Sequence, residues 1–90
     1  MTRRIVRTLK YMEPIEYNDG HGFKTIVEMS DGKHVLISEI HRRKSSHELD
    51  ETVAFECDKD GRVTDWSEMC CSGEDTAEVI SRVADWYTHS

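Results

Sequence analysis

Apolar and polar residues alternate between Phe23 and Ile40, on both sides of the dipeptide Asp31-Gly32. A period of two is typical of β-strands, and Asp-Gly tolerates the positive φ angles of a tight type I′ turn. The segment therefore predicts a β-hairpin in which Val27 lies opposite Leu36. In this register one face is apolar and suits a protein core, and it consists of Phe23, Val27, Leu36 and Ile40.

The same register directs a second apolar set to the other face, which also carries a Lys24–Glu39 pair of opposite charges. The set comprises Val6, Ile26, Val35 and Ile37. One helix covers one face only, so this set is exposed, covered by a loop, or buried against a partner or a second copy of the chain. Contiguous exposed apolar area usually marks an interface, so we expect Ile26, Val35 and Ile37 to bind a partner, with a homodimer as the default.

The rest of the chain predicts three further strands, at residues 3–12, 52–58 and 62–69. Pro14 stops the first strand, because proline has no N–H to donate to a sheet ladder. Asp58 to Gly61 predicts a turn with Gly61 at positive φ. Residues 15–22 and 41–50 are rich in turn formers or lack periodicity, and they predict exposed loops.

Near the C-terminus the apolar spacing changes to three and four residues, which is typical of an amphipathic helix. Its stripe consists of Thr76, Val79, Ile80, Val83 and Tyr87. Ser72 is the expected N-cap, with acidic residues in the first turn. The sequence thus predicts an α+β fold: a single domain of residues 1–90 with a four- to five-stranded antiparallel meander sheet and one C-terminal α-helix packed on one face.

Charge is distributed unevenly along the chain. The 90 residues carry a net charge of −6, with a balance of +3 over residues 1–47 and −9 over residues 48–90. This balance argues against a module that binds nucleic acid directly. The acidic half presents negative charge that suits a basic protein partner, and ordinary surface charge for solubility explains it equally well.

The three cysteines, of which Cys70 and Cys71 are adjacent, form a poor disulfide framework and fit a reducing compartment. The chain has no apolar run of membrane-spanning length, and its first residues lack the apolar core of a signal peptide. We therefore expect a cytoplasmic protein with free thiols and no membrane association.

Sequence motifs for metal binding or catalysis match this chain only weakly. Residues 56–67 resemble a calcium loop except at the last ligand position, where Ser67 replaces the bidentate acid. The cysteines and histidines lack the spacing of structural zinc sites, and no nucleophile elbow or phosphate-binding loop occurs. We therefore expect no catalytic residues, no metal and no cofactor. A small metal- or thiol-dependent enzyme that uses Cys57, Cys70 or Cys71 remains the alternative from another class.

Trp66 stands between Asp65 and Glu68, and tryptophan is enriched at binding hot spots. An apolar anchor among carboxylates suits a specific contact with a basic surface, since charge alone gives weak and promiscuous attraction. The expected partner-binding residues on this acidic side are Asp65, Trp66, Glu68, Glu74 and Glu78.

The compact hairpin TVAFECDKDGRVTDWSEM, the single C-terminal helix and the acid-rich surface resemble small acidic accessory proteins of phages and mobile elements, a group that includes the anti-CRISPR proteins. The likeness covers the whole chain in size and style and contains no specific motif. It implies a non-enzymatic protein that blocks a nucleic-acid-processing enzyme through an acidic surface. The alternative is a structural or assembly subunit that dimerises through its sheet face.

Overall fold

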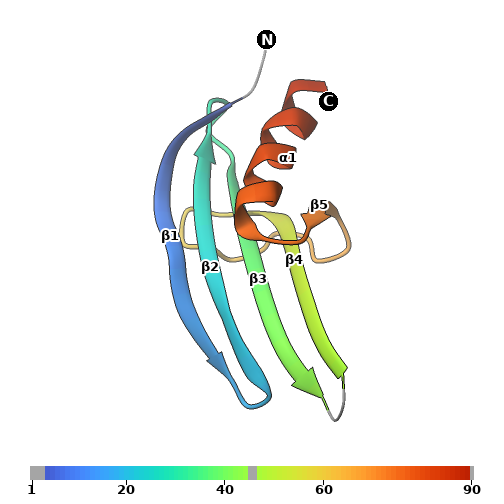
Figure 1. The fold of residues 1–90 in the computed structure, drawn as a ribbon. Coiled ribbons are helices and arrows are strands. Elements are labelled where there is room, and N and C mark those ends of the chain that lie inside the picture. The colour runs from blue at the N-terminus through green and yellow to red at the C-terminus, as the bar shows by residue number, and fades with distance from the viewer. Residues whose placement is uncertain (1–3, 45–46, 90) are drawn as a thin grey trace.

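The computed structural model describes residues 4–44 and 47–89, with side chains described for residues 4–42 and 51–84. Along the chain the elements are β1 (Ile5–Tyr17), β2 (Gly20–Met29), β3 (His34–Lys44), β4 (His47–Cys57), β5 (Met69–Gly73) and α1 (Thr76–His89). Sequential strands pair antiparallel in the order β1-β2-β3-β4-β5, and α1 lies on one face of the sheet (Figure 1). The predicted antiparallel meander with a C-terminal helix is confirmed.

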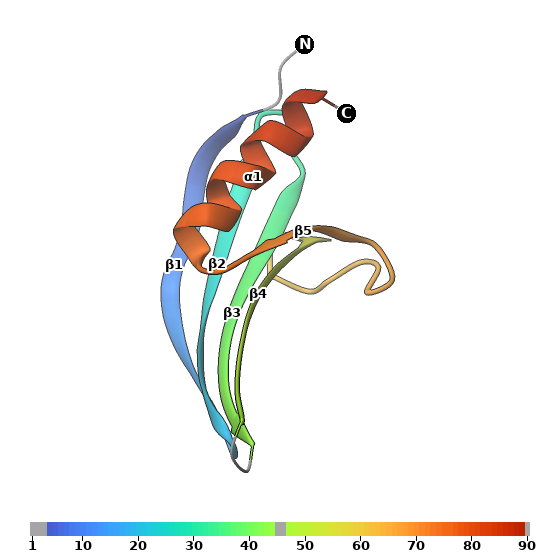
Figure 2. The same ribbon diagram turned by 45° about the vertical axis from the view of Figure 1, so that its right-hand side comes forward.

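The helix covers only part of the sheet. A helix of 14 residues is about 21 Å long, whereas the longest dimension of the molecule is 47 Å. Figures 1 and 2 show α1 over one end of β2 and β3, while the four long strands extend well beyond it as an arm. The start of α1 therefore lies near the middle of the sheet.

The hairpin around Asp31-Gly32 is confirmed, but its predicted register is wrong by one residue. The N–H of Met29 donates to the carbonyl of Lys33 (2.7 Å), and the N–H of Gly32 donates to the carbonyl of Met29 (3.0 Å). With Gly32 at φ +88°, this is a three-residue loop with a glycine bulge and not a two-residue type I′ turn. Val27 consequently pairs with Val35, and Ile26 pairs with Leu36.

This shift redistributes the apolar residues between the two faces. The face under α1 carries the main core, which consists of Val27, Met29, Val35, Ile37 and Ala54 packed against Val79 and Val83. The opposite face carries a smaller core of Ile26, Leu36 and Cys57, with Leu9 and Val63 beside it. The predicted core face is therefore wrong, because Val27 and Leu36 point to opposite sides of the sheet.

The segment after β4 covers the smaller core. Asp58 to Arg62 repeats the three-residue loop, with an Asp58 N–H to Arg62 carbonyl bond of 2.9 Å, and the predicted positive φ of Gly61 is confirmed at +88°. A Cβ at Gly61 would lie 2.7 Å from Ile26 Cδ1, so the turn lies directly on the smaller core.

Several predicted boundaries are wrong. Pro14 does not end β1, because β1 is an edge strand, where a missing N–H can face away from the sheet. Most of residues 41–50 extend β3 and β4 and do not form a loop. Only an isolated Cys57–Val63 bridge forms in place of the strand at 62–69, and the fifth strand starts at Met69.

The predicted N-cap of the helix, Ser72, is also wrong. Asp75 caps α1, accepting the N–H of Glu78 on Oδ1 (2.9 Å) and the N–H of Val79 on its carbonyl (3.1 Å), whereas Ser72 belongs to β5. The stripe prediction holds for Thr76, Val79 and Val83, which are all buried. The side chain of Tyr87 lies outside the described residues.

Candidate functional site

Residues 63–68, here called the Trp66 loop, link the Asp58–Arg62 turn to β5. The preceding turn is stiffened by Asp58, whose Oδ1 accepts the N–H of Asp60 (2.8 Å) and of Arg62 (3.0 Å). These bonds, chiefly that from Arg62, lower the pKa of the Asp58 carboxyl. The loop therefore leaves the sheet from a well-defined anchor.

A second aspartate turn lies inside the Trp66 loop. Asp65 Oδ1 accepts the hydroxyl of Ser67 (2.6 Å) and its N–H (2.9 Å). The hydrogen bond from the Ser67 hydroxyl lowers the pKa of Asp65 most, and the bond from the Ser67 N–H lowers it further. The carboxylate therefore stays ionised at a lower pH than that of an ordinary aspartate. Both Asp65 and Glu68 are exposed, and Asp65 is held in one orientation.

Among the described side chains, Trp66 is the most exposed of the large apolar residues, at 69 %. Its ring rests on Phe55 of β4, with ring centroids 5.1 Å apart and a tilt of 59°. Met69, at the start of β5, is 51 % exposed. Large apolar side chains held in place yet exposed are typical of binding surfaces.

A cavity of about 400 Å³ opens where the Trp66 loop meets β4 and β5. Here it is called the acidic cavity, because three of its lining residues, Glu56, Asp65 and Glu68, are carboxylates. Met69 and Cys70 form its apolar wall. The loop thus presents two features, the Trp66 ring against β4 and a cavity lined by carboxylates.

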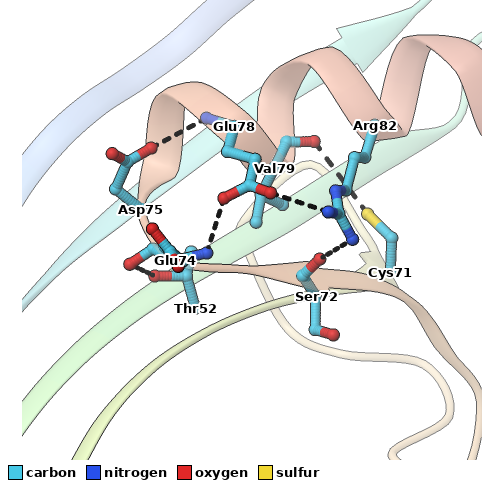
Figure 3. Close-up of polar contacts among 8 residues, drawn as sticks. All are labelled: Thr52, Cys71, Ser72, Glu74, Asp75, Glu78, Val79 and Arg82. Atoms are coloured by element: carbon cyan, nitrogen blue, oxygen red, sulfur yellow. Dashed lines mark hydrogen bonds and ion pairs between the residues drawn. The ribbon is translucent and has the colours of Figure 1, made fainter.

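The predicted residues Glu74 and Glu78 lie elsewhere, at the start of α1 (Figure 3). Glu78 is engaged within the chain: its Oε1 lies 2.7 Å from Arg82, and its Oε2 accepts the N–H of Glu74 at 2.9 Å. Arg82 also donates to the carbonyl of Ser72 (3.1 Å). Within residues 4–44 and 47–89, no hydrogen bond or ion pair joins this group to Asp65 or Glu68. Glu78 therefore serves the junction between β5 and α1.

The predicted apolar partner surface is wrong. Val35 and Ile37 are fully buried under α1, and Ile26 is 1 % exposed beneath the Asp58–Arg62 turn. The one-residue register shift places Ile26 on the face opposite Val35 and Ile37, and each face has its own cover. These three side chains have no surface to offer a partner.

A polar cluster at the start of α1 was not predicted from the sequence. The Glu39 side chain, only 6 % exposed, accepts the N–H and the hydroxyl of Thr76 on Oε1 (2.7 and 2.9 Å). Its Oε2 lies 2.9 Å from His41 Nε2, and the His41 ring stacks on His21 with centroids 5.2 Å apart. One carboxylate therefore connects α1 to β3 and, through the stacked rings, to β2.

Burial alone would raise the pKa of Glu39, but the hydrogen bonds from His41 and Thr76 outweigh burial and lower it below the ordinary 4.5. The expected Lys24–Glu39 pair is wrong, because Lys24 lies opposite Ser38 and Glu39 lies opposite Phe23. The position of Glu39 could be predicted by continuing the alternation of buried residues, Val35 and Ile37, to the next position on the same face of β3. This step requires the correct hairpin register.

The cysteines are free thiols. Burial raises the pKa of Cys57 to about 11, and burial does the same for Cys71. Among the described residues, no group of three or more His, Cys, Asp or Glu side chains is placed to hold a metal ion. No helix in the described part is both long and apolar enough to cross a membrane.

These pKa values predict slow labelling of both thiols. The reactive thiolate of Cys57 or Cys71 is about 100-fold scarcer at pH 7 than that of a cysteine with the ordinary pKa. Peptide mapping after brief iodoacetamide treatment should find Cys57 and Cys71 largely unmodified in the native protein and fully modified in urea. Rapid native labelling of Cys57 would contradict its burial beneath the Asp58–Arg62 turn.

Comparison with known proteins finds no match: no family model, no curated protein and no solved structure is similar to this chain.

Proposed function

We propose that this chain binds a basic surface of another protein through the Trp66 loop, and that the partner is an enzyme acting on nucleic acid. The observation that carries the proposal is the 69 % exposure of Trp66 between two exposed acidic residues, Asp65 and Glu68. A large aromatic ring on a protein surface supplies binding energy, and the carboxylates beside it select a cationic partner.

The charge around the loop supports a basic partner. Enzymes that act on nucleic acid carry basic grooves for phosphates. Carboxylates on a stiff loop can occupy such a groove at a small entropic cost, because little ordering accompanies binding. Asp58 and Asp65 are both locked by backbone N–H groups of their own turns, which supplies this stiffness.

Two alternative functions, assembly through the sheet face and thiol-dependent catalysis, have less support. Assembly through the sheet face relied on Ile26, Val35 and Ile37, which are buried in the chain's own cores. A thiol nucleophile is poorly served by Cys57 and Cys71, since thiols with a pKa of about 11 are almost fully protonated near neutral pH.

A pull-down from a lysate of the source organism, followed by mass spectrometry, tests the proposal. Trp66→Ala is expected to weaken capture of the main partner by about 30-fold or more, as for a hot spot of 2 kcal/mol. Tyr11→Ala is the matched control, because Tyr11 is a comparably exposed aromatic residue at 65 % but lies on the edge strand β1.

Charge reversal tests the electrostatic part. Asp60→Lys with Glu68→Lys reverses one exposed carboxylate of the Trp66 loop, Glu68, and one of the turn that precedes it, Asp60. The pair spares Asp65, which holds the loop. This pair should abolish capture, whereas the same reversal at Glu16 and Glu51, two exposed acids on the strands, should leave it unchanged. Equal losses from both double variants would refute a specific role for the loop, and capture of a partner without a basic surface would refute the partner class.

A further inference from the structure

The acidic cavity has a composition that suits one kind of side chain. Its volume of about 400 Å³ lies in the range of ligand pockets and far exceeds the ~30 Å³ of one water molecule in the liquid. Its walls combine the carboxylates of Glu56, Asp65 and Glu68 with the apolar side chain of Met69. A ligand that fits both needs an extended apolar stem and a cationic head.

A cation of this chain already contacts the wall. Lys33, from the turn between β2 and β3, places its Nζ 3.2 Å from Glu56 Oε1. Both side chains of this pair are about half exposed, at 51 % and 40 %, so the contact is exchangeable and weak. The Lys33 contact shows that the carboxylate of Glu56 is within reach of a flexible cationic side chain at the protein surface.

The other two carboxylates that line the cavity, those of Asp65 and Glu68, differ in how firmly they are held. Asp65 is oriented by Ser67 (2.6 and 2.9 Å) and retains a second oxygen, Oδ2, outside those bonds. The carboxylate of Glu68 has no hydrogen bond or ion pair within the part of the chain that the structure describes. Thus one fixed and one adaptable carboxylate line the same cavity.

We propose that the acidic cavity receives an arginine side chain of the basic partner. A guanidinium offers five N–H donors in a planar fork, which can satisfy two or three carboxylates at once, whereas an ammonium is a compact point charge. The methylene stem of the arginine packs on Met69, since long cationic side chains bury their stems on apolar surface. This inference rests on the proposed function and specifies the partner chemistry at the loop.

Amide ¹⁵N–¹H spectra titrated with three capped peptides test the inference. The peptides are Gly-Arg-Gly, Gly-Lys-Gly and Gly-citrulline-Gly, the last being a neutral isostere of arginine. The arginine peptide should shift amides between residues 56 and 70, the lysine peptide should bind several-fold more weakly, and citrulline should cause no saturable shift. Equal binding of citrulline and arginine would overturn the electrostatic assignment, and equal binding of lysine would overturn the guanidinium assignment.

Two substitutions sharpen the test. Lys33→Ala removes the internal competitor and should tighten arginine binding by about 2- to 5-fold, the range of a weak surface ion pair. Glu68→Gln should weaken binding by a similar factor, and Glu16→Gln, on β1, is the control. Unchanged affinity in both cavity variants, or no shift with any peptide, would refute the cavity as an arginine site. Because Trp66 does not line the cavity, the Trp66→Ala pull-down can still succeed after such a failure.

Discussion

Replacing Ile37 with alanine is expected to lower the free energy of unfolding by about 2–5 kcal/mol, the usual cost of truncating a fully buried aliphatic residue. Ile37 is 0 % exposed and lies in the main core with Val35, Val79 and Val83. The loss combines the transfer of the removed methyl and methylene groups with the cavity left between β3 and α1. Urea denaturation followed by far-ultraviolet circular dichroism measures it.

Ile40→Ala is the informative control. The hairpin register predicted from the sequence put Ile40 in the core and Ile37 on the other face, whereas the structure leaves Ile40 only half-buried. The structure therefore predicts a clearly smaller loss for Ile40→Ala than for Ile37→Ala. The opposite ranking, with an unchanged denaturant slope in both variants, would show that the two-residue turn and its register are correct.

Replacing Glu39 with alanine should cost roughly 1–3 kcal/mol for each buried donor that is left without a partner. The donors are the N–H and the hydroxyl of Thr76, which both bond Glu39 Oε1. The first turn of α1 would lose its connection to β3, so amide hydrogen exchange at residues 76–79 should accelerate more than exchange in β2. Glu51→Ala, at an exposed carboxylate on β4, should change stability by no more than about 0.5 kcal/mol.

The same carboxylate predicts a pH dependence. Because the pKa of Glu39 is lower in the folded chain than the ordinary 4.5, its contribution to stability is complete above that value and is lost as pH falls through the folded pKa. Below pH 4.5, wild-type stability should therefore fall more steeply than that of Glu39→Gln. Parallel curves for the two proteins would mean that Glu39 is not the ionised acceptor for Thr76.

The architecture was predictable because strand and helix periodicities differ strongly between residues 23–40 and 76–83. The exact pairing was not predictable, since Asp-Gly suits two turn types that differ by one residue. The two registers direct Val35 and Ile37 together to one face of the sheet or to the other. Residues 41–50 escaped prediction for a different reason. Their sequence has no alternating apolar pattern, so the pairing of residues 41–44 and 47–50 follows from continuation of the β2–β3–β4 ladder.

The candidate surface was predictable only in part. Trp66 stood out because a tryptophan beside carboxylates is unusual in a core, and the structure places it on the surface. The acidic cavity depends on Glu56 and Met69 meeting across two strands, a proximity that no local pattern encodes. Glu74 and Glu78 carry the same charge as Asp65, but they serve the β5–α1 junction through local contacts, since Glu78 pairs with Arg82 four residues further on and accepts the N–H of Glu74.

The most direct test of the Trp66 loop as the contact surface is site-specific photo-crosslinking in a lysate of the source organism. A photoreactive phenylalanine analogue is placed at position 66 in one protein and at position 11 in another, since both side chains are exposed to a similar degree. A single major crosslinked partner is expected from position 66, with a yield that falls as salt rises, and no such product from position 11. The same partner crosslinked from position 11 and not from position 66 would contradict this expectation.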